Sequence, residues 1–126
     1  MAIPTALLEA GRPATADIVV KQGDTFLMTI TVRLAGVAVD ITGLTAAMKI
    51  KATIGGTLLA TPTCAVPVGS DGKILATMTP AVTAALTATG TAREVALGFW
   101  DCALSDGTDK VTVAGGAVSL WRKVTA

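Results

Sequence analysis

The chain has 126 residues, of which 52% are hydrophobic and only 3% aromatic, and its formal net charge is +1. This length fits one domain with a substantial core. Ten Lys and Arg residues stand against nine Asp and Glu, with no run of basic residues. A nucleic-acid surface needs clustered cations and aromatic side chains for stacking, so the composition predicts no nucleic-acid partner.

The sequence also predicts no membrane partner. Its longest uncharged stretch, residues 52–70, is broken by glycines and prolines and is unsuited to span a bilayer. The first thirteen residues lack the basic start and long apolar core of a signal peptide. We therefore expect Cys64 and Cys102 to be free, buried thiols. The mean hydropathy of +0.66 is high for a soluble monomer and indicates a surface partly covered by other subunits.

Residues 1–16 form a predicted N-terminal arm. Pro4 and Pro13 bracket a segment that permits one or two helical turns. An arm is ordered only where it docks. Its apolar side chains are therefore candidate contacts with a neighbouring subunit: Ile3, Leu7 and Leu8.

From residue 17 the hydrophobic pattern has period two, which is typical of half-buried strands. A first strand at residues 17–21 leads through a glycine turn into a strand at 26–34. The segment 45–53 alternates in the same way, with Met48 and Ile50 facing inward. Strands with one polar face pair antiparallel.

The middle of the chain mixes edge strands with one helix. Pro62 and Pro67 lack a backbone N–H, so their segments belong at a sheet edge or a bulge. An alternating strand follows at residues 73–79. The helix after it has Thr79 as its N-cap, a proline at its first position and Gly90 as its stop.

The last third predicts three more strands, at residues 94–106, 110–114 and 117–124. Asp106-Gly107 makes the first turn, and the pair Gly115-Gly116 makes the second reversal. Strands of this length with turns between them predict an all-β fold. We expect an antiparallel Ig-like β-sandwich of about seven to nine strands, with one short helix, over residues 17–126.

No catalytic or metal-binding constellation stands out. Asp101 lies beside Cys102, but the chain has no histidine to activate a thiolate. Neighbours on a strand face opposite ways, so Cys102 and Trp100 belong to the core. Asp101, Asp106 and Asp109 lack the spacing of a calcium loop and suit turns. The sequence predicts no enzyme, cofactor or metal.

Trp121 is the remaining candidate for function. Val118 and Leu120 mark the inward face of the last strand, so Trp121 should point outward beside Arg122. An exposed tryptophan among cations favours a subunit contact, with Arg122 as its neighbour in that contact. A sugar-stacking site at Trp121 is the alternative.

Several segments together resemble a known family. They are QGDTF, VDITGLTAAMKIK, DGKILATMTPAVTAAL, GFWDCALSDG and GGAVSLWRKV. In order and spacing they resemble small β-sandwich virion proteins of tailed bacteriophages, including the N-terminal domains of baseplate upper proteins. The resemblance spans residues 17–126. It implies that Asp40 shapes a turn and that the helix caps one end of the sandwich. The family usually has Tyr-Asp where this chain has Trp100-Asp101.

The resemblance implies a non-enzymatic structural protein of the virion, assembled in the bacterial host cytoplasm. Its expected place is the tail tip, the baseplate or a tail-fibre attachment. Its arm and sheet faces would bind other virion proteins and copies of itself. A carbohydrate-binding module for host adsorption and a capsid decoration protein are the alternatives.

Overall fold

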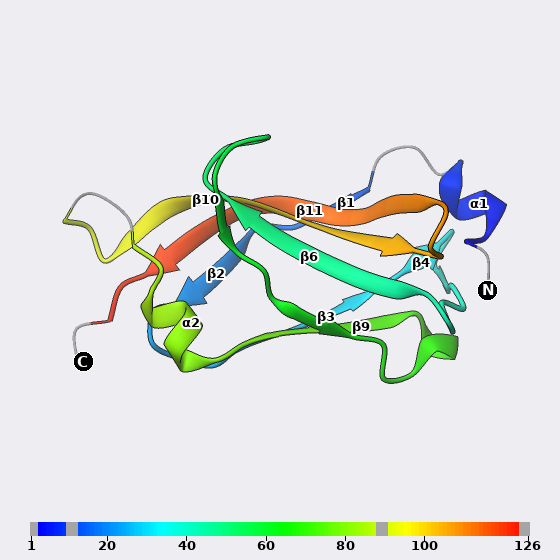
Figure 1. Cartoon of the computed structure of the whole chain (residues 1–126), viewed down its shortest axis with the longest axis horizontal. Helices are drawn as coiled ribbons and strands as arrows, with labels where there is room; N and C mark the ends of the chain where they lie inside the picture. The colour runs from blue at the N-terminus through cyan, green and yellow to red at the C-terminus, as the bar shows by residue number, and fades with distance from the viewer. Residues whose placement is uncertain (1–2, 10–12, 88–90, 124–126) are drawn as a thin grey trace.

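The computed structural model describes residues 3–9, 13–87 and 91–123. Within these ranges the chain forms two packed β-sheets, with short helices at the ends (Figure 1). The elements in chain order are α1 (Thr5–Leu8), β1 (Ala14–Thr15), β2 (Ile18–Lys21), β3 (Phe26–Thr31), β4 (Arg33–Leu34), β5 (Val37–Ala38), β6 (Thr45–Lys51), β7 (Leu58–Ala60), β8 (Thr63–Ala65), a 3-10 turn (Gly69–Asp71), β9 (Lys73–Met78), α2 (Pro80–Ala84), β10 (Glu94–Ser105) and β11 (Lys110–Trp121). None of the described helices is long and apolar enough to cross a membrane.

The strand order is that of an Ig-like β-sandwich, which confirms the predicted fold class. The large sheet has the order β1-β11-β10-β6-β7, with β2 also on β11, and the small sheet has the order β3-β9-β8. A two-stranded hairpin of β4 and β5 accompanies them. Pairing is antiparallel except that β1 and β2 run parallel to β11. Three-stranded and larger sheets packed face to face are the signature of this architecture.

The described chain has more strands than predicted because one predicted strand is divided and because two-residue strands form in the predicted arm and in the connection before β6. The predicted strand at residues 26–34 splits into β3 and β4, and the latter pairs with β5 in a separate hairpin. Three of the eleven described strands have only two residues each. The proline-bearing segments do form the edge strands β7 and β8, as predicted.

The core lies between the two sheets and follows the period-two pattern. In β3, Phe26 and Ile30 are buried while Leu27 is exposed. In β10, Trp100 and Cys102 face inward, as predicted. Alternation works as a signal here because each sheet has one face on the core and one away from it.

The predicted reversal at Gly115-Gly116 is wrong, because β11 runs unbroken through both glycines. The glycines serve close packing. A Cβ on Gly116 would collide with the Ala16 carbonyl oxygen, where the chain passes from β1 to β2. The Trp100 indole N–H donates a 2.8 Å hydrogen bond to that same carbonyl. The missing side chain therefore lets the N-terminal strands and the Trp100 indole meet against β11.

Two local sequence signals are confirmed. The Asp40 carboxylate accepts hydrogen bonds from the Thr42 N–H (2.9 Å) and hydroxyl (2.6 Å), which shapes the expected turn. The Thr79 hydroxyl accepts from the Val82 N–H at 3.4 Å and caps α2, which lies at one end of the sandwich (Figure 1). The helix ends at Ala84, before the predicted stop at Gly90, which lies outside the described residues.

Candidate subunit-contact surfaces

The N-terminal arm packs against its own domain. Ile3 and Leu7 are buried in the same core as the sheets, and the Ile3 N–H donates to the Asp106 carboxylate at 3.2 Å. The last residues of the predicted arm form β1 and pair with β11. Contacts of Ile3 or Leu7 with a neighbour would therefore require the arm to leave its own domain. Leu8 is exposed and stays a candidate contact.

Asp106 organises the turn between β10 and β11. Its Oδ1 atom accepts hydrogen bonds from the N–H groups of Thr108 (2.8 Å) and Asp109 (2.7 Å). Together with the Ile3 N–H, these donors hold the pKa of the Asp106 carboxyl below its ordinary value. Asp106 thus has a local structural role. No group of three or more His, Cys, Asp or Glu in the described ranges is placed to hold a metal ion.

Trp121 points outward at the end of β11, as predicted, with 41% of its surface exposed. The Arg93 guanidinium lies over its ring, 5.2 Å from the ring centroid, a cation–π arrangement. In the sheet, Trp121 pairs with Glu94 on one side and Lys21 on the other. The indole is therefore already held by a cation of the same chain.

Four cations gather around Trp121 in what we call the basic corner: Lys21, Arg93, Arg122 and Lys123. Together with Trp121, Gln22 and Asp24 they line a cleft of about 450 Å³. The ammonium group of Lys123 lies 2.9 Å from the Asp24 carboxylate, and this contact lowers the pKa of Asp24. The structure thus brings the predicted pair Trp121 and Arg122 into one cleft. Sequence reasoning missed the cluster because its cations come from three separate segments.

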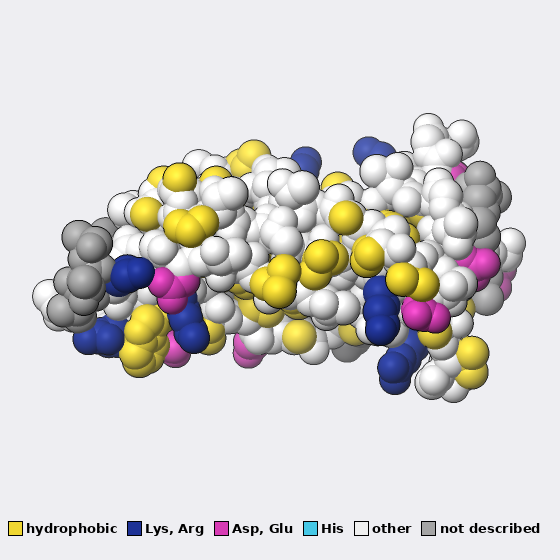
Figure 2. All heavy atoms as spheres, turned by 90° about the horizontal axis from the view of Figure 1, so that it is seen from below, with side chains coloured by type: hydrophobic (Ala, Val, Ile, Leu, Met, Phe, Trp, Pro, Cys, Tyr) yellow, Lys and Arg dark blue, Asp and Glu magenta, His cyan; other side chains and the backbone are white. Residues whose placement is uncertain are grey.

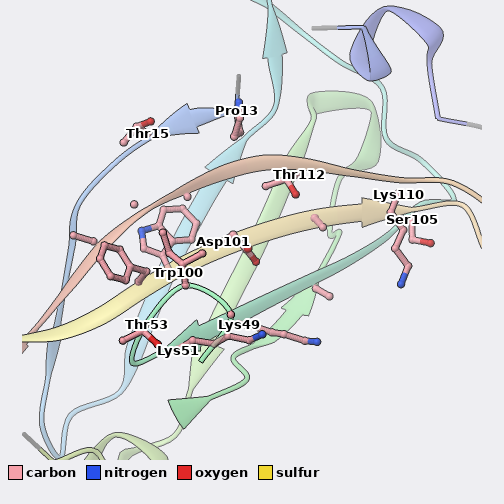
Figure 3. Close-up of a pocket in the computed structure, with 18 of the residues that line it drawn as sticks. Pro13, Thr15, Lys49, Lys51, Thr53, Trp100, Asp101, Ser105, Lys110 and Thr112 are labelled. Carbon is pink, nitrogen blue, oxygen red and sulfur yellow. The ribbon is translucent and has the colours of Figure 1, made fainter. Parts of the chain in front are cut away.

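A broad groove lies on the outward side of the large sheet, which we call the large-sheet face (Figure 3). Its volume is about 1120 Å³. The floor consists of small side chains on β6, β10 and β11. Around it lie Lys49 and Lys51 on β6, Asp101 on β10 and Lys110 on β11 (Figure 3), together with Phe99. The loop after β6, with Thr53 and Ile54, also lines it. The sequence did not predict this groove, because the loop's course over the sheet leaves no local signal.

The outward side of the small sheet, the small-sheet face, has a different character. Its eight outward residues are Leu27, Thr29, Thr31, Thr63, Ala65, Lys73, Leu75 and Thr77. Among these eight, Lys73 carries the single charge, at the start of β9. Leu27 is 66% exposed. In Figure 2 the middle of this side of the molecule has hydrophobic and uncharged side chains, and most charged side chains lie toward its two ends.

The two cysteines are free thiols on opposite sheets. Cys102 is buried, as predicted, but Cys64 is only half-buried because β8 is an edge strand. The neighbouring Cys102 thiol lowers the pKa of Cys64 to about 7. The Cys64 thiol, together with burial, raises the pKa of Cys102.

No protein-family profile matches the chain, and no curated protein sequence matches it. Among solved structures, the chain is similar to one described as the crystal structure of the ZIG-8-RIG-5 IG1-IG1 heterodimer, monoclinic form. The sequence identity is 12% and the TM-score 0.37, over 90% of this chain and 84% of that one. A likeness this weak transfers neither a partner nor an activity to the present chain.

Proposed function

We propose that this chain is a non-enzymatic structural subunit that binds other protein subunits, and that it works in the virion of a tailed bacteriophage. The observation that carries the proposal is the small-sheet face. Seven of its eight outward side chains are uncharged, and Leu27 on it is well exposed. Such a face loses little hydration energy when a protein covers it.

The basic corner supports the same proposal in a second way. Its cations lie at one end of the sandwich, around the partly exposed Trp121. Charges at the margin of a contact steer association and fix orientation more than they add affinity. In a symmetric particle, many weak contacts of this kind act together, so no single contact needs to be strong.

The chemistry of the described residues supports a role without catalysis. The chain has no histidine, and the thiol whose pKa is lowered, Cys64, donates to the Pro62 carbonyl oxygen at 3.9 Å. Asp40 and Asp106 are engaged in turns. A nucleophile needs a base within hydrogen-bond reach to be activated. Asp101 neighbours Cys102 along β10, but Asp101 is exposed and Cys102 is buried, so the two side chains point to opposite faces of the sheet.

The virion assignment rests on the resemblance of the sequence to small phage β-sandwich proteins. That resemblance favours the tail tip, the baseplate or a tail-fibre attachment. A capsid decoration protein would use the same surfaces elsewhere in the particle. Imaging purified particles that carry a labelled copy of the chain distinguishes a tail component from a capsid decoration protein. Density for the label at the tail supports the tail position, and density over the shell supports the capsid position.

The direct test compares one added charge on each sheet face. Thr63→Lys places it on the small-sheet face, and Thr112→Lys places it on the large-sheet face, as the matched control. We expect Thr63→Lys to reduce incorporation into particles and Thr112→Lys to leave it unchanged. Both variants should keep their stability within about 0.5 kcal/mol, as is usual for surface substitutions. Normal incorporation of Thr63→Lys would contradict the proposal.

A carbohydrate-binding role through Trp121 is the second candidate, and its support is the partly exposed indole. Because Arg93 lies over the ring, a sugar would have to use the opposite ring face or displace the guanidinium. Fluorescence titration with glycans tests this, and Trp121→Phe isolates the signal of buried Trp100. Saturable quenching in the wild type that disappears in Trp121→Phe would favour sugar binding over the purely structural role.

A further inference from the structure

Among the described strands, the orders of the two main sheets end in four edges, and three of these four carry features that discourage pairing with another chain. Strand β7 has three residues, and β8 has three residues between Pro62 and Pro67. The edge made by β1 and β2 is interrupted at Asp17, whose carboxylate accepts a hydrogen bond from the Ala117 N–H. Short strands, prolines, interruptions and charges are the usual ways in which proteins protect an edge.

The fourth edge, β3, has none of these features. It pairs with β9 on one side and ends the order of the small sheet on the other. Its sequence FLMTIT has six residues without a charge, proline or glycine, and all of them except Met28 and Leu27 are β-branched or aromatic. Half of the backbone N–H and C=O groups of such a strand point away from its sheet. The edge is therefore a ready template for another strand.

We propose that the β3 edges of two copies of this chain pair antiparallel about a twofold axis near Met28. Two small sheets would then form one continuous sheet of six strands. This contact is isologous, so the same surface serves both copies. The inference does not depend on the virion role, because it follows from the edge alone.

The pattern of side chains suits this pairing. With Met28 opposite Met28 of the second copy, Phe26 lies opposite Ile30 and Leu27 lies opposite Thr29. Residues that face the core in one copy then meet core-facing residues in the other, and the outward residues meet likewise. A shift by one residue would place inward side chains opposite outward ones, so this register is favoured. Aromatic and β-branched side chains directly opposite each other are favourable cross-strand pairs.

The flanking charges favour the antiparallel direction and a second copy as the occupant. Asp24 precedes β3 and Arg33 follows it. In an antiparallel pair, the end of β3 that carries Asp24 approaches the end that carries Arg33 in the second copy. Arg33 then meets the Asp24 carboxylate, which also pairs with Lys123 of its own chain at 2.9 Å. A parallel pair would bring like charges together. The strand is thus complementary to itself in one direction.

The test is the association state of the whole chain, measured by sedimentation velocity over a concentration series. We expect the wild type to form a dimer reversibly. Thr29→Lys adds a cation at the middle of the edge, next to its symmetry mate, and should weaken dimerisation by at least about tenfold, the effect of a repulsion near 1.4 kcal/mol. Leu27→Lys should weaken dimerisation in the same way, and it is the variant to measure if Thr29→Lys does not fold.

Thr63→Lys is the matched control, because it adds the same charge to the small-sheet face on β8, away from the β3 edge. It should dimerise like the wild type even if it fails to enter particles, so failure of the edge and failure of the proposed function are distinguishable. A wild type that stays monomeric throughout the series would overturn the inference. Loss of the dimer in Thr63→Lys but not in Thr29→Lys would overturn it as well.

Discussion

The outer faces of the two sheets differ although their inner faces are alike. Both sheets bury large aliphatic and Met side chains against each other, such as Ile74 on the small sheet and Leu104 on the large one. Outside, the large-sheet face carries Lys49, Lys51 and Lys110 around a groove, whereas the small-sheet face carries threonines and Leu27. Folding constrains the two inner faces equally. Function can therefore act on the outer faces, and we propose that the small-sheet face is the one that meets a protein.

The largest expected effect is the loss of stability when a core side chain is truncated. Making this change once in each sheet tests whether the two sheets contribute equally to the core. Leu104→Ala on β10 and Ile74→Ala on β9 each remove a side chain with no exposed surface. We expect both to lower the free energy of unfolding by about 2–5 kcal/mol, through lost burial and the cavity left behind. Urea unfolding measures both. A loss below about 1 kcal/mol at either site would show that its sheet is not part of one shared core.

The next effect concerns the large sheet alone. Gly116→Ala places a methyl group against the Ala16 carbonyl oxygen, so β1 and β2 must shift. Overpacking of this kind costs about 1–3 kcal/mol. The shift should also break the hydrogen bond from the Trp100 indole, which changes its fluorescence emission in a Trp121→Phe background. Unchanged emission and stability would contradict the role assigned to Gly116.

A smaller effect is expected at the end of the small sheet, where α2 follows β9. Thr79→Ala removes the hydroxyl that accepts from the Val82 N–H. Loss of an N-cap costs about 1 kcal/mol. Thr87→Ala, an exposed threonine after the helix, is the control and should change stability by less than about 0.5 kcal/mol. Equal effects of the two substitutions in thermal unfolding would argue against the cap.

The smallest effect is a pH dependence at the end of the large sheet. The pKa of Asp106 is lowered by the N–H groups of Asp109, Thr108 and Ile3. The ionised Asp106 carboxylate therefore stabilises the folded chain fully above the unfolded-state pKa. This stabilisation is lost as the pH falls through the lower folded-state pKa. We expect acidification to release Ile3 while the sheets stay folded, seen as faster hydrogen exchange at the N-terminal amides. Asp106→Asn keeps one acceptor oxygen, for Thr108 and Asp109, but places an NH2 group opposite the Ile3 N–H. Its N-terminal amides should therefore exchange fast at every pH and show no such pH step.

The sequence predicted what depends on local pattern. Alternation identified the inward residues of β3 and β10, and residue chemistry identified the Asp40 turn and the Thr79 cap. What it missed depends on distant parts of the chain. Gly116 resembles a turn residue, and its real constraint is Ala16, a hundred residues away.

At the candidate site, too, local pattern was predictable and contacts between distant residues were not. The outward direction of Trp121 followed from the alternation of β11, and the structure confirms it. The cation on its ring, Arg93, comes from the segment before β10, so its place could not be predicted. Ile3 and Leu7 are apolar residues of an N-terminal segment, a pattern that fits a neighbour's surface as well as the chain's own core.

Hydroxyl-radical footprinting of free protein and of purified particles shows which of the two sheet faces a neighbouring subunit covers. Leu27 and Phe99 are matched probes, one on each face, with 66% and 44% of their surfaces exposed. If the small-sheet face is the contact, assembly protects Leu27 from oxidation and leaves Phe99 as reactive as in the free chain. Protection of Phe99 with Leu27 still reactive would contradict this contact.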